Sequence, residues 1–386
     1  MNIAIDINGA FSGTGLSNYI ISLINSIAKI DGENKYFLFA HSWKDHRKDP
    51  AWLNLPRGQN FNLVYKHLPE VPVLWAEYAL GVRITERILS SYGIDVFHGT
   101  GNIIPRLRSI ASVLTVHHYK GFPGGVVPDS FSPKEKFYFK CTDDSVNNAD
   151  YIITDSEHTK KDIKENLKIK DESISTVYAG LSDIFHIYDS EFKSLIKKKY
   201  DLPDKFIFVS GPINERKNLL RLLEAFAALR HNFTDLELVI SGDTDGNYFA
   251  NLISRIISLK LENYVHFIGF VPGLDMPGVY GLAQMLVYPS LYEGFGFPPL
   301  EAMACGCPVA ASNVSSIPEV VGDAGLLFNP YDTGEILSAV EKLLKDAGLR
   351  TRLISNGLDR SSGFTWMRTA KKTIEIYRKA YEGLKK

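Results

Sequence analysis

The sequence predicts an α/β protein with two doubly wound domains. Short apolar runs alternate with amphipathic stretches along the chain, which is the pattern of βαβ units that build parallel sheets. At 386 residues the chain is longer than one ordinary core accommodates, and each half is long enough to bury its own hydrophobic interior. Open parallel sheets bind ligands at the carboxyl ends of their strands, so we expect a central ligand cleft that both domains face.

The first predicted domain covers residues 1–190. Its strand-like runs are residues 3–7, 35–39, 62–65, 96–98, 112–116, 151–154 and 175–178. Its helix-like stretches include residues 16–30, 82–92 and 156–167. The polar passage SDIFHIYDSEFKSLIKKKYDLPDK that follows has no apolar run long enough for a sheet strand, and we interpret it as the linker.

The second predicted domain covers residues 191–366 and repeats the alternation. Its strands and helices are expected at residues 206–210, 219–229, 236–241, 248–259, 265–268, 285–288 and 308–312. The last segment, residues 367–386, predicts a lysine-rich amphipathic helix, which we interpret as a solvated face; a membrane anchor is the minority interpretation.

Composition narrows the function classes. The 43 basic and 44 acidic residues give a formal charge of -1, so no global field favours nucleic acid. Three cysteines, Cys141, Cys305 and Cys307, are too few for a disulfide framework and indicate core thiols in a reducing compartment. The opening MNIAIDI predicts a buried strand rather than a signal peptide, and no apolar run reaches about 18 residues. We expect a cytoplasmic protein, with peripheral contact at the inner face of a membrane left open.

The run VYPSLYEGFGFPPLEAMACGCPVAAS predicts a strand, a glycine-rich loop, a helix at about residues 298–305 and a second strand. Gly294 and Gly296 free the backbone for close approach to a ligand, and N–H groups at the helix start favour an anionic or hydroxyl-rich one. Glu293 in the loop and Glu301 in the helix are expected to face different parts of an extended ligand. For an isolated glutamate, turn capping or a helix-dipole contact would be the better interpretation.

A second pattern, FVSGPINERKNLLRLLEAFAAL, again predicts a strand, a loop and an amphipathic helix. We expect Arg216 and Lys217 in the first turn of that helix, where the helix dipole disfavours cations. Two adjacent cations at such a place indicate a local anion, and arginine with lysine suits a diphosphate.

The stretch EGFGFPPLEAMACGCPV resembles the signature of retaining glycosyltransferases with the GT-B fold, in glycosyltransferase family 4 (group 1). The resemblance implies that Glu293, Gly294 and Phe295 hold hydroxyls of the transferred sugar and that Glu301 binds the nucleotide ribose, with Gly296 in the same donor loop. Matching stretches at ADYIITDSEHTKKDI, IPEVVGDAGLLFNPYD and FTWMRTAKKTIEIYRKAY extend the resemblance over nearly the whole chain. It further implies that the final helix packs back on the first domain.

Further residues are carried over from the same resemblance. Gly211, Arg216 and Lys217 would neutralise the diphosphate leaving group. A loop near the acceptor and diphosphate would correspond to Gly13, Thr14 and Gly15, which alone is a weak phosphate signal. His117, at the end of an apolar run, would lie near the reacting sugar carbon; His118 stands where the family has aspartate. We assign His98 a structural role, because a histidine at a strand end is more often structural than catalytic.

The resemblance implies transfer of a hexose from a nucleoside-diphosphate sugar to an acceptor hydroxyl with retained configuration. We expect no metal and no cofactor besides the nucleotide-sugar co-substrate, since Arg216, Lys217 and a helix N-terminus can carry the diphosphate charge. GDP-mannose is the favoured donor and a UDP-hexose the alternative. The expected acceptor is a glycan or a polyprenyl-linked glycan of surface-polysaccharide synthesis, such as lipopolysaccharide.

Two other function classes are alternatives. An NAD-dependent oxidoreductase is suggested only by the doubly wound domains and the Gly13–Gly15 loop, and no acidic residue is clearly placed after that loop to hold an adenosine ribose. A catalytically silent sugar-binding or scaffold protein conflicts with the intact glutamates and the Arg216–Lys217 pair. Transfer without added nicotinamide separates these classes.

Overall fold

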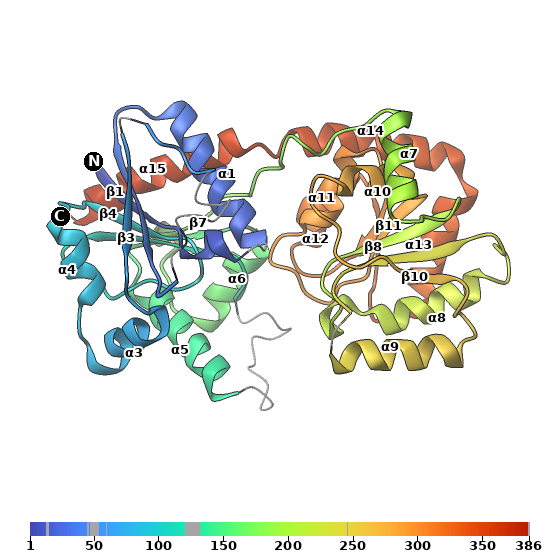
Figure 1. Ribbon diagram of the computed structural model, residues 1–386, viewed down its shortest axis with the longest axis horizontal. Coiled ribbons are helices and arrows are strands. Elements are labelled where there is room, and N and C mark those ends of the chain that lie inside the picture. Colours follow the sequence, from blue (N-terminus) through green and yellow to red (C-terminus); the bar gives the residue numbers. More distant parts are fainter. Residues whose placement is uncertain are drawn as a thin grey trace. The chain divides into compact units, whose positions relative to one another are not determined.

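The computed structural model describes residues 1–12, 15–44, 46, 54–58, 60–119, 132–244 and 246–384. The chain forms two compact units: Met1–Gly180 with Thr365–Lys386, and Leu181–Phe364 (Figure 1). The first boundary thus falls after Gly180 rather than after residue 190, and the segment from Thr365 onward belongs to the first unit.

The sheet of the first unit has seven parallel strands in the order β3-β2-β1-β4-β5-β6-β7. The chain starts in the centre with β1, moves outward to β2 and β3, and then crosses to β4 on the other side of β1. The carboxyl ends of β1 and β4 therefore form the point at which the strand order reverses. The strands are β1 (Asn2–Asp6), β2 (Lys35–His41), β3 (Phe61–Lys66), β4 (Val96–Gly99), β5 (Ala111–Val116), β6 (Tyr151–Thr154) and β7 (Ile174–Thr176).

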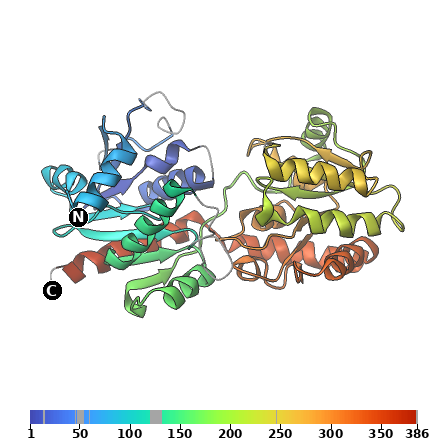
Figure 2. The ribbon, with the colours of Figure 1, turned by 90° about the horizontal axis from the view of Figure 1, so that it is seen from below.

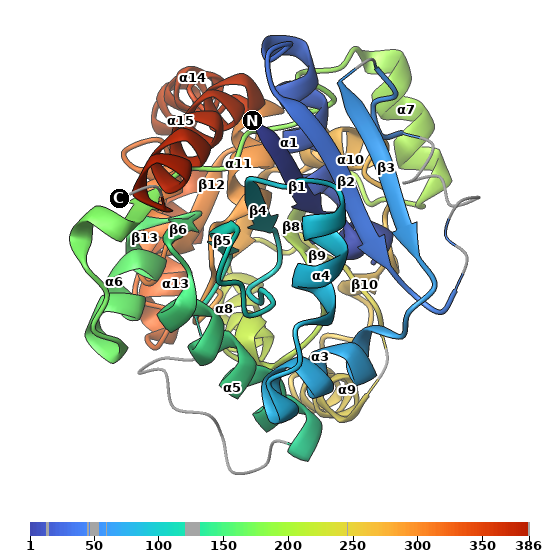
Figure 3. The ribbon, with the colours of Figure 1, turned by 90° about the vertical axis from the view of Figure 1, so that its left-hand side faces the viewer.

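Helices cover this first sheet (Figure 3). They are η1 (Asn8–Phe11), α1 (Gly15–Ile30), α3 (Glu70–Leu80), α4 (Ile84–Ser91), α5 (Pro133–Asn148), α6 (Glu157–Asn166), η3 (Asp171–Ser173) and the last helix, α15 (Trp366–Leu384). The core under them is aliphatic and aromatic and includes Ala4, Phe39, Phe97, Leu114 and Ile152.

The last helix, α15, returns to the first unit after the chain has completed the second (Figures 1 and 2). It packs along α1, where the rings of Tyr19 and Trp366 meet edge to face with centroids 5.5 Å apart. Thr369 Oγ1 donates to the Tyr178 carbonyl at 2.8 Å. A Cβ at Gly180 would lie 2.2 Å from the Trp366 nitrogen, so only glycine fits at position 180, beside the first residue of α15.

The sheet of the second unit has six parallel strands in the order β10-β9-β8-β11-β12-β13. The chain starts in the centre with β8, moves outward to β9 and β10, and then crosses to β11, so the strand order reverses between β8 and β11. The strands are β8 (Phe206–Ser210), β9 (Glu237–Ser241), β10 (Val265–Phe267), β11 (Met285–Tyr288), β12 (Val309–Ser312) and β13 (Leu326–Phe328). The helices are α7 (Ser190–Lys199), η4 (Glu215–Lys217), α8 (Leu219–Leu229), α9 (Asn247–Ser258), α10 (Met276–Leu282), α11 (Phe297–Ala304), α12 (Ile317–Val321), α13 (Thr333–Lys345) and α14 (Ala347–Ser362).

Two local predictions were wrong. The polar passage interpreted as a linker contains α7, whose N-cap Asp189 side chain accepts from the Phe192 amide, and which belongs to the second unit. Arg216 and Lys217 do not enter the first turn of α8: they form the separate 3₁₀ turn η4. Asn218, in the left-handed region at φ 56°, separates that turn from α8. The helix expected at residues 298–305 begins and ends one residue earlier, as α11.

Among the helices in the described part of the chain, none combines the length and apolar character needed to span a membrane.

Candidate functional site

Four of the predicted site residues gather at the reversal point of the second sheet. Gly211, Arg216 and Lys217 follow β8, and Glu293 follows β11, its neighbour in the sheet. Because both strands are parallel, their carboxyl ends lie at one edge, and the loops that follow them meet there. The Leu291 amide donates to the Arg216 carbonyl at 2.8 Å and ties the two loops together.

Glu293 is held by both cations. Lys217 Nζ donates to Glu293 Oε1 at 2.9 Å, and Arg216 Nη1 pairs with Glu293 Oε2. Lys217 Nζ also donates to the Tyr288 hydroxyl at 2.8 Å, and Arg216 Nη1 donates to the Tyr292 carbonyl at 2.8 Å. Both of these contacts with described residues use Nη1 of Arg216, so the guanidinium has further N–H groups with which to bind an anion.

The pKa values in this cluster depend on both burial and the neighbouring charges. Burial raises the pKa of Glu293, but the neighbouring Lys217 and Arg216 outweigh it and lower that pKa to about 2. Burial lowers the pKa of Lys217, with Glu293 opposing the effect. The Lys217 side chain is 4% exposed and the Arg216 side chain 32%, so Arg216 is the cation that a solvent-borne ligand reaches more readily.

Backbone geometry fixes the position of Lys217. Gly211 has φ +124°, and a Cβ there would lie 2.8 Å from Lys217 Cε and 2.9 Å from its Nζ. The Asn218 side-chain amide donates to the carbonyls of Pro289 and Pro330, at 3.2 and 2.7 Å. The close approach of β8's loop to the lysine therefore requires glycine, while Asn218 anchors the turn.

The loop from Glu293 to Gly296 is shaped by two serines that follow β12. The Glu293 amide donates to Ser315 Oγ at 3.0 Å, and Ser316 Oγ donates to the carbonyls of Glu293 and Phe295 at 2.8 and 2.7 Å. The Phe295 ring is buried, so a ligand can meet that residue only through its backbone. Gly296, at φ +118°, is the N-cap of α11 and makes no side-chain cap; because Pro298 and Pro299 have no N–H, Phe297 has the one amide N–H among the first three residues of α11.

Glu301 lies in α11, where the Tyr280 hydroxyl donates to its Oε2 at 2.9 Å. Burial raises the pKa of Glu301 to about 7, with the Tyr280 hydrogen bond and the Lys217 charge opposing the effect. The two glutamates therefore differ in charge state. Glu293 is ionised within an ion-pair cluster, whereas Glu301 changes charge near neutral pH.

His117 belongs to the first unit and follows β5. Its Nδ1 lies 2.5 Å from Asp155 Oδ2, after β6, and its Nε2 lies 2.8 Å from the Thr100 carbonyl, after β4. Burial lowers the pKa of His117, but Asp155 outweighs it and the pKa is raised overall. A carbonyl and a carboxylate both accept, so the two contacts favour an imidazolium with a proton on each nitrogen.

His98 has the structural role that the sequence predicted. It is fully buried, with its nitrogens 2.7 Å from the Tyr377 hydroxyl of α15 and the Thr115 hydroxyl of β5. Burial lowers the pKa of His98 to about 3, so it stays neutral and ties the last helix to the sheet.

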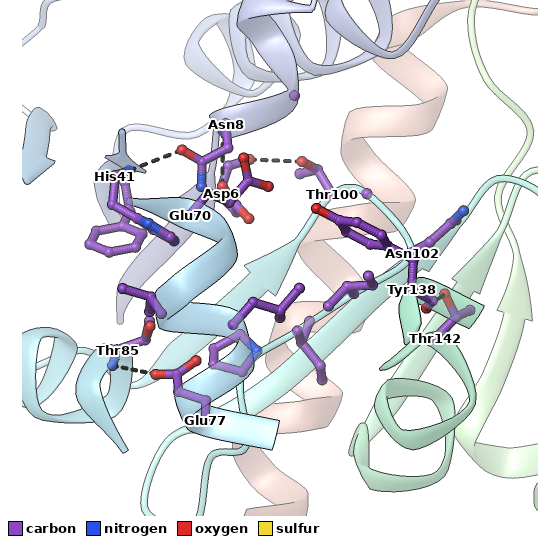
Figure 4. A pocket seen from close by; sticks show the side chains of 18 of the residues that line it. Asp6, Asn8, His41, Glu70, Glu77, Thr85, Thr100, Asn102, Tyr138 and Thr142 are labelled. Carbon is purple, nitrogen blue, oxygen red and sulfur yellow. Dashed lines mark hydrogen bonds between the residues drawn. The ribbon is translucent and has the colours of Figure 1, made fainter. Parts of the chain in front are cut away.

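A cavity of about 500 Å³ opens at the reversal point of the first sheet (Figure 4). Asp6 ends β1 and Asn8 follows it, while Thr100 and Asn102 follow β4; together they form a polar end. The walls include residues of α3 and α5, and half of the other lining residues are apolar: Leu16, Phe39, Val73, Leu74, Phe97, Ile103, Ile104, Pro105 and Phe139. Burial raises the pKa of Asp6 to about 6. The cavity thus combines hydroxyl-binding groups with apolar walls.

The predicted glycine loop of the first unit is only partly described. Gly13 and Thr14 lie outside the described residues, and Gly15 is the exposed first residue of α1. A Cβ at Gly15 would meet nothing within 4 Å, so protein packing does not require glycine there, and its contact with a ligand stays a prediction.

Sequence reasoning missed Asp155, Tyr288 and Tyr280. Asp155 ends the run YIITD directly before a helix, and that position at the carboxyl end of a strand was an available signal. The two tyrosines look like core residues in the sequence, because their apolar rings are buried and only their hydroxyls reach the site. Among the described residues, no cluster of three or more histidine, cysteine or acidic side chains could hold a metal ion.

Two family models match the chain, one on each unit. The model described as Glycosyl transferases group 1 matches residues 192–360, and Glycosyltransferase Family 4 matches residues 13–183. The chain belongs to the glycosyltransferases of family 4. The predicted family resemblance and enzyme class are confirmed. Membership in this family excludes the oxidoreductase alternative.

Similar curated proteins support the same family. This glycosyltransferase is 29% identical to O-antigen chain mannosyltransferase B of Escherichia coli over 95% of this chain and 96% of that protein. It is 29% identical to O-antigen chain mannosyltransferase RfbU of Salmonella typhimurium over 86% and 88%. It is also 32% identical to the serotype-specific mannosyltransferase WbdA of Escherichia coli, but that match covers only 28% of WbdA.

Solved structures confirm the fold. Sucrose-phosphate synthase of Thermosynechococcus elongatus superposes with a TM-score of 0.77 at 19% identity, over 99% of this chain and 100% of that one. HepE of Anabaena, solved with UDP and glucose, gives 0.73 at 17% identity over 97% and 99%. The predicted GT-B class, with two Rossmann-like domains, is therefore correct.

Proposed function

We propose that this glycosyltransferase is a mannosyltransferase of surface-polysaccharide synthesis that moves mannose from GDP-mannose to a hydroxyl of a glycan acceptor. The observation that carries the proposal is the Arg216–Lys217–Glu293 cluster at the reversal point of the second sheet. The names of the O-antigen mannosyltransferases that the chain resembles support the choice of sugar and pathway class.

The cluster is suited to a diphosphate leaving group. As the bond from the sugar to the phosphate breaks, negative charge grows on the phosphate, and cations fixed there stabilise the transition state more than the ground state. Arg216 contributes unused guanidinium N–H groups, and Lys217 contributes a fixed charge behind it. In this proposal these two cations carry the charge that a metal ion carries elsewhere.

Glu293 acts as a binding group in this proposal. A pKa of about 2 makes the carboxylate a weak nucleophile, and each of its oxygens faces a cation. Each oxygen still has a lone pair with which to accept a sugar hydroxyl. The sugar is transferred with retained configuration, and the acceptor proton passes to the departing phosphate. Glu301, in α11, accepts hydrogen bonds from the ribose hydroxyls.

The first unit holds the acceptor. The polar end of its cavity, at Asp6, Asn8, Thr100 and Asn102, suits a sugar with several hydroxyls. His117 is engaged through both ring nitrogens and does not remove the acceptor proton. It is instead a fixed cation at the carboxyl end of β5.

The test is a transfer assay with radiolabelled GDP-mannose and a glycan acceptor, followed by determination of the anomeric configuration of the product. The proposal predicts one added mannose with retained configuration and release of GDP. Transfer from UDP-hexoses but not from GDP-mannose would reject the proposed donor. An inverted product would reject the mechanism.

A further inference from the structure

The cavity of the first unit is lined by acidic groups (Figure 4). Three acidic side chains, Asp6, Glu70 and Glu77, contribute to its lining. Among the lining residues that the structure describes, none is a lysine or an arginine. Asp6 ends β1, whereas Glu70 and Glu77 belong to α3. The acidic groups therefore come from two elements, the edge of the sheet and a helix of the wall.

No basic side chain in the described part of the chain forms an ion pair with Asp6 or Glu77. Their hydrogen-bond donors are neutral: Asp6 Oδ1 accepts from the Asn8 amide at 2.9 Å, and Glu77 Oε1 accepts from the Thr85 amide at 2.6 Å. Burial raises the pKa of both carboxyls, that of Asp6 to about 6. Asp6 is therefore ionised above neutral pH, and its charge is not balanced by a neighbouring cation.

The histidines near the cavity do not balance this charge. His41 lines the cavity, but burial lowers its pKa and leaves it neutral at neutral pH, although nearby glutamates oppose the effect. His118 also lines the cavity, and its exposed position lets water and salt screen its charge. The imidazolium of His117 is not part of the lining, and its Nδ1 faces Asp155 Oδ2. The field inside the cavity is therefore negative.

We propose that this cavity selects an uncharged sugar of the acceptor and rejects sugars that carry a phosphate or a carboxylate. The inference rests on the proposed function, in which the cavity holds the acceptor. Carboxylate and amide groups, such as those of Asp6 and Asn8, form good hydrogen bonds with the hydroxyls of an uncharged ring. An anionic ring would instead bring a like charge close to Asp6, between partly apolar walls where the repulsion is poorly screened.

The two reversal points would then separate the two substrates by charge. The second unit presents Arg216 and Lys217 to the diphosphate of the donor, whereas the first unit presents acidic groups. Specificity of this kind depends on repulsion of the wrong ligand as well as on attraction of the right one. A nucleotide sugar is therefore disfavoured in the acceptor cavity. By the same reasoning, any phosphate group of a lipid-linked acceptor must lie outside the cavity.

The experiment measures binding of two probes to the full chain at pH 8 by saturation-transfer NMR titration, without a donor sugar. The probes are methyl α-mannoside and methyl α-mannuronoside, which differ only in the carboxylate that replaces the C6 hydroxymethyl group. Excess GDP is present to occupy the cation cluster of the second unit. We expect the wild type to bind the mannoside at least about tenfold more tightly than the mannuronoside.

Asp6→Asn removes the charge but keeps an oxygen that accepts from the Asn8 amide. It should bind the mannuronoside at least about tenfold more tightly than the wild type does, a gain that an unfolded variant cannot produce. Glu77→Gln is the second variant and should shift this affinity in the same direction. The matched control is Glu86→Gln, because Glu86 is also buried and accepts from backbone amides but does not line the cavity. The control should discriminate between the probes as the wild type does.

Several results would overturn the proposal. They are equal wild-type affinity for the two probes, no binding of the mannoside, unchanged mannuronoside affinity in both cavity variants, or an equal gain in the control. Transfer of mannose to a neutral glycan is measured separately. Such transfer together with equal affinity for the probes would reject the charge selection alone. Discrimination between the probes without any transfer would reject the proposed function and leave the charge selection of the cavity in place.

Discussion

Arg216 and Lys217 are adjacent in sequence, but they occupy different environments. Lys217 is buried beneath the loop and pairs with Glu293, whereas about a third of the Arg216 side chain is exposed. Removing one partner of a buried ion pair costs about 3–5 kcal/mol of stability, and an exposed pair is worth about 0–1 kcal/mol. Substitution of Arg216 should therefore change catalysis with less effect on folding stability than substitution of Lys217.

Arg216→Ala is expected to lower kcat by about a hundredfold to a thousandfold, the usual loss when one fixed donor to a developing anion is removed. Its melting temperature should stay near that of the wild type. Steady-state kinetics and calorimetry measure the two effects. Arg255→Ala is the control, because Arg255 also pairs with a glutamate, Glu224, at 2.7 Å and its side chain is 39% exposed. Equal kcat values for the two variants would remove Arg216 from the mechanism.

Asp155→Asn tests the charge on His117. Because Asp155 raises the folded-state pKa of His117, the pair stabilises the fold fully below the unfolded pKa of about 6.5 and less as pH rises through the folded value. The loss of melting temperature in Asp155→Asn should therefore be larger at pH 6 than at pH 9. Differential scanning calorimetry at both pH values measures it. A loss that does not change with pH would show that His117 is not held as an imidazolium.

Glu301→Gln tests the ribose contact. Glu301 gains its charge near pH 7, so wild-type affinity for GDP-mannose should rise about fivefold from pH 6 to pH 8, since charge-assisted hydrogen bonds exceed neutral ones by about 1 kcal/mol. The variant should show no such rise. Titration calorimetry at pH 6 and pH 8 measures the affinity of both proteins for GDP-mannose. A parallel rise in both proteins would place the titrating group elsewhere.

At the residue level, motifs in the sequence indicate candidate site residues, whereas only the fold shows which of their side chains lie together. Glu293, Arg216 and Lys217 were predicted separately, and the fold brings them into one cluster. Tyr288 was missed because its contact with Lys217, 71 positions away, leaves no local pattern. Asp155 was missed although it stands at the end of a predicted strand, 38 positions from His117.

At the level of elements, the loop after β8 is the part that positions the site. Gly211 allows the chain to pass within contact distance of Lys217, and η4 turns both cations toward the carboxyl edge of β11. The loop is short, so changes in its backbone reach the ion pair directly.

Gly211→Ala should cost both stability and activity. Its φ of +124° strains an L-residue by about 1–3 kcal/mol. The new Cβ would also displace the Lys217 ammonium from Glu293. Gly246→Ala is the matched control, because Gly246 also has a positive φ, +95°, but its Cβ would meet nothing within 4 Å. Unfolding midpoints should fall in both variants, and kcat in Gly211→Ala alone. A comparable fall of kcat in the control would mean that strain, not the lysine, controls activity.

Elements with a clear period were predicted well. Residues 206–210 and 219–229 coincide with β8 and α8, because both follow strong apolar patterns. Helix α3 was not predicted, since EVPVLWAEYAL is apolar on both faces and lacks a helical period. The 3₁₀ turn η4 was merged with α8, although asparagine, a residue type enriched in the left-handed region, stands at position 218 between them.

On the scale of the molecule, the two units have the same design: each is a parallel sheet whose strand order reverses at the strand where it starts. The second reversal point holds the cation cluster, and the first holds the cavity. The sequence predicted two sheets from alternation alone. It placed the boundary too late, because α7 is polar and looked like linker.

The central claim is that the second unit binds a GDP-sugar through the Arg216–Lys217–Glu293 cluster. The most direct measurement is titration calorimetry of the full chain with GDP-mannose, UDP-glucose and ADP-glucose, repeated for Arg216→Ala. We expect GDP-mannose to bind at least about tenfold more tightly than the other two sugars, a difference of about 1.4 kcal/mol, and Arg216→Ala to weaken its binding. Tighter binding of the UDP-sugar, or GDP-mannose binding that Arg216→Ala leaves unchanged, would contradict it.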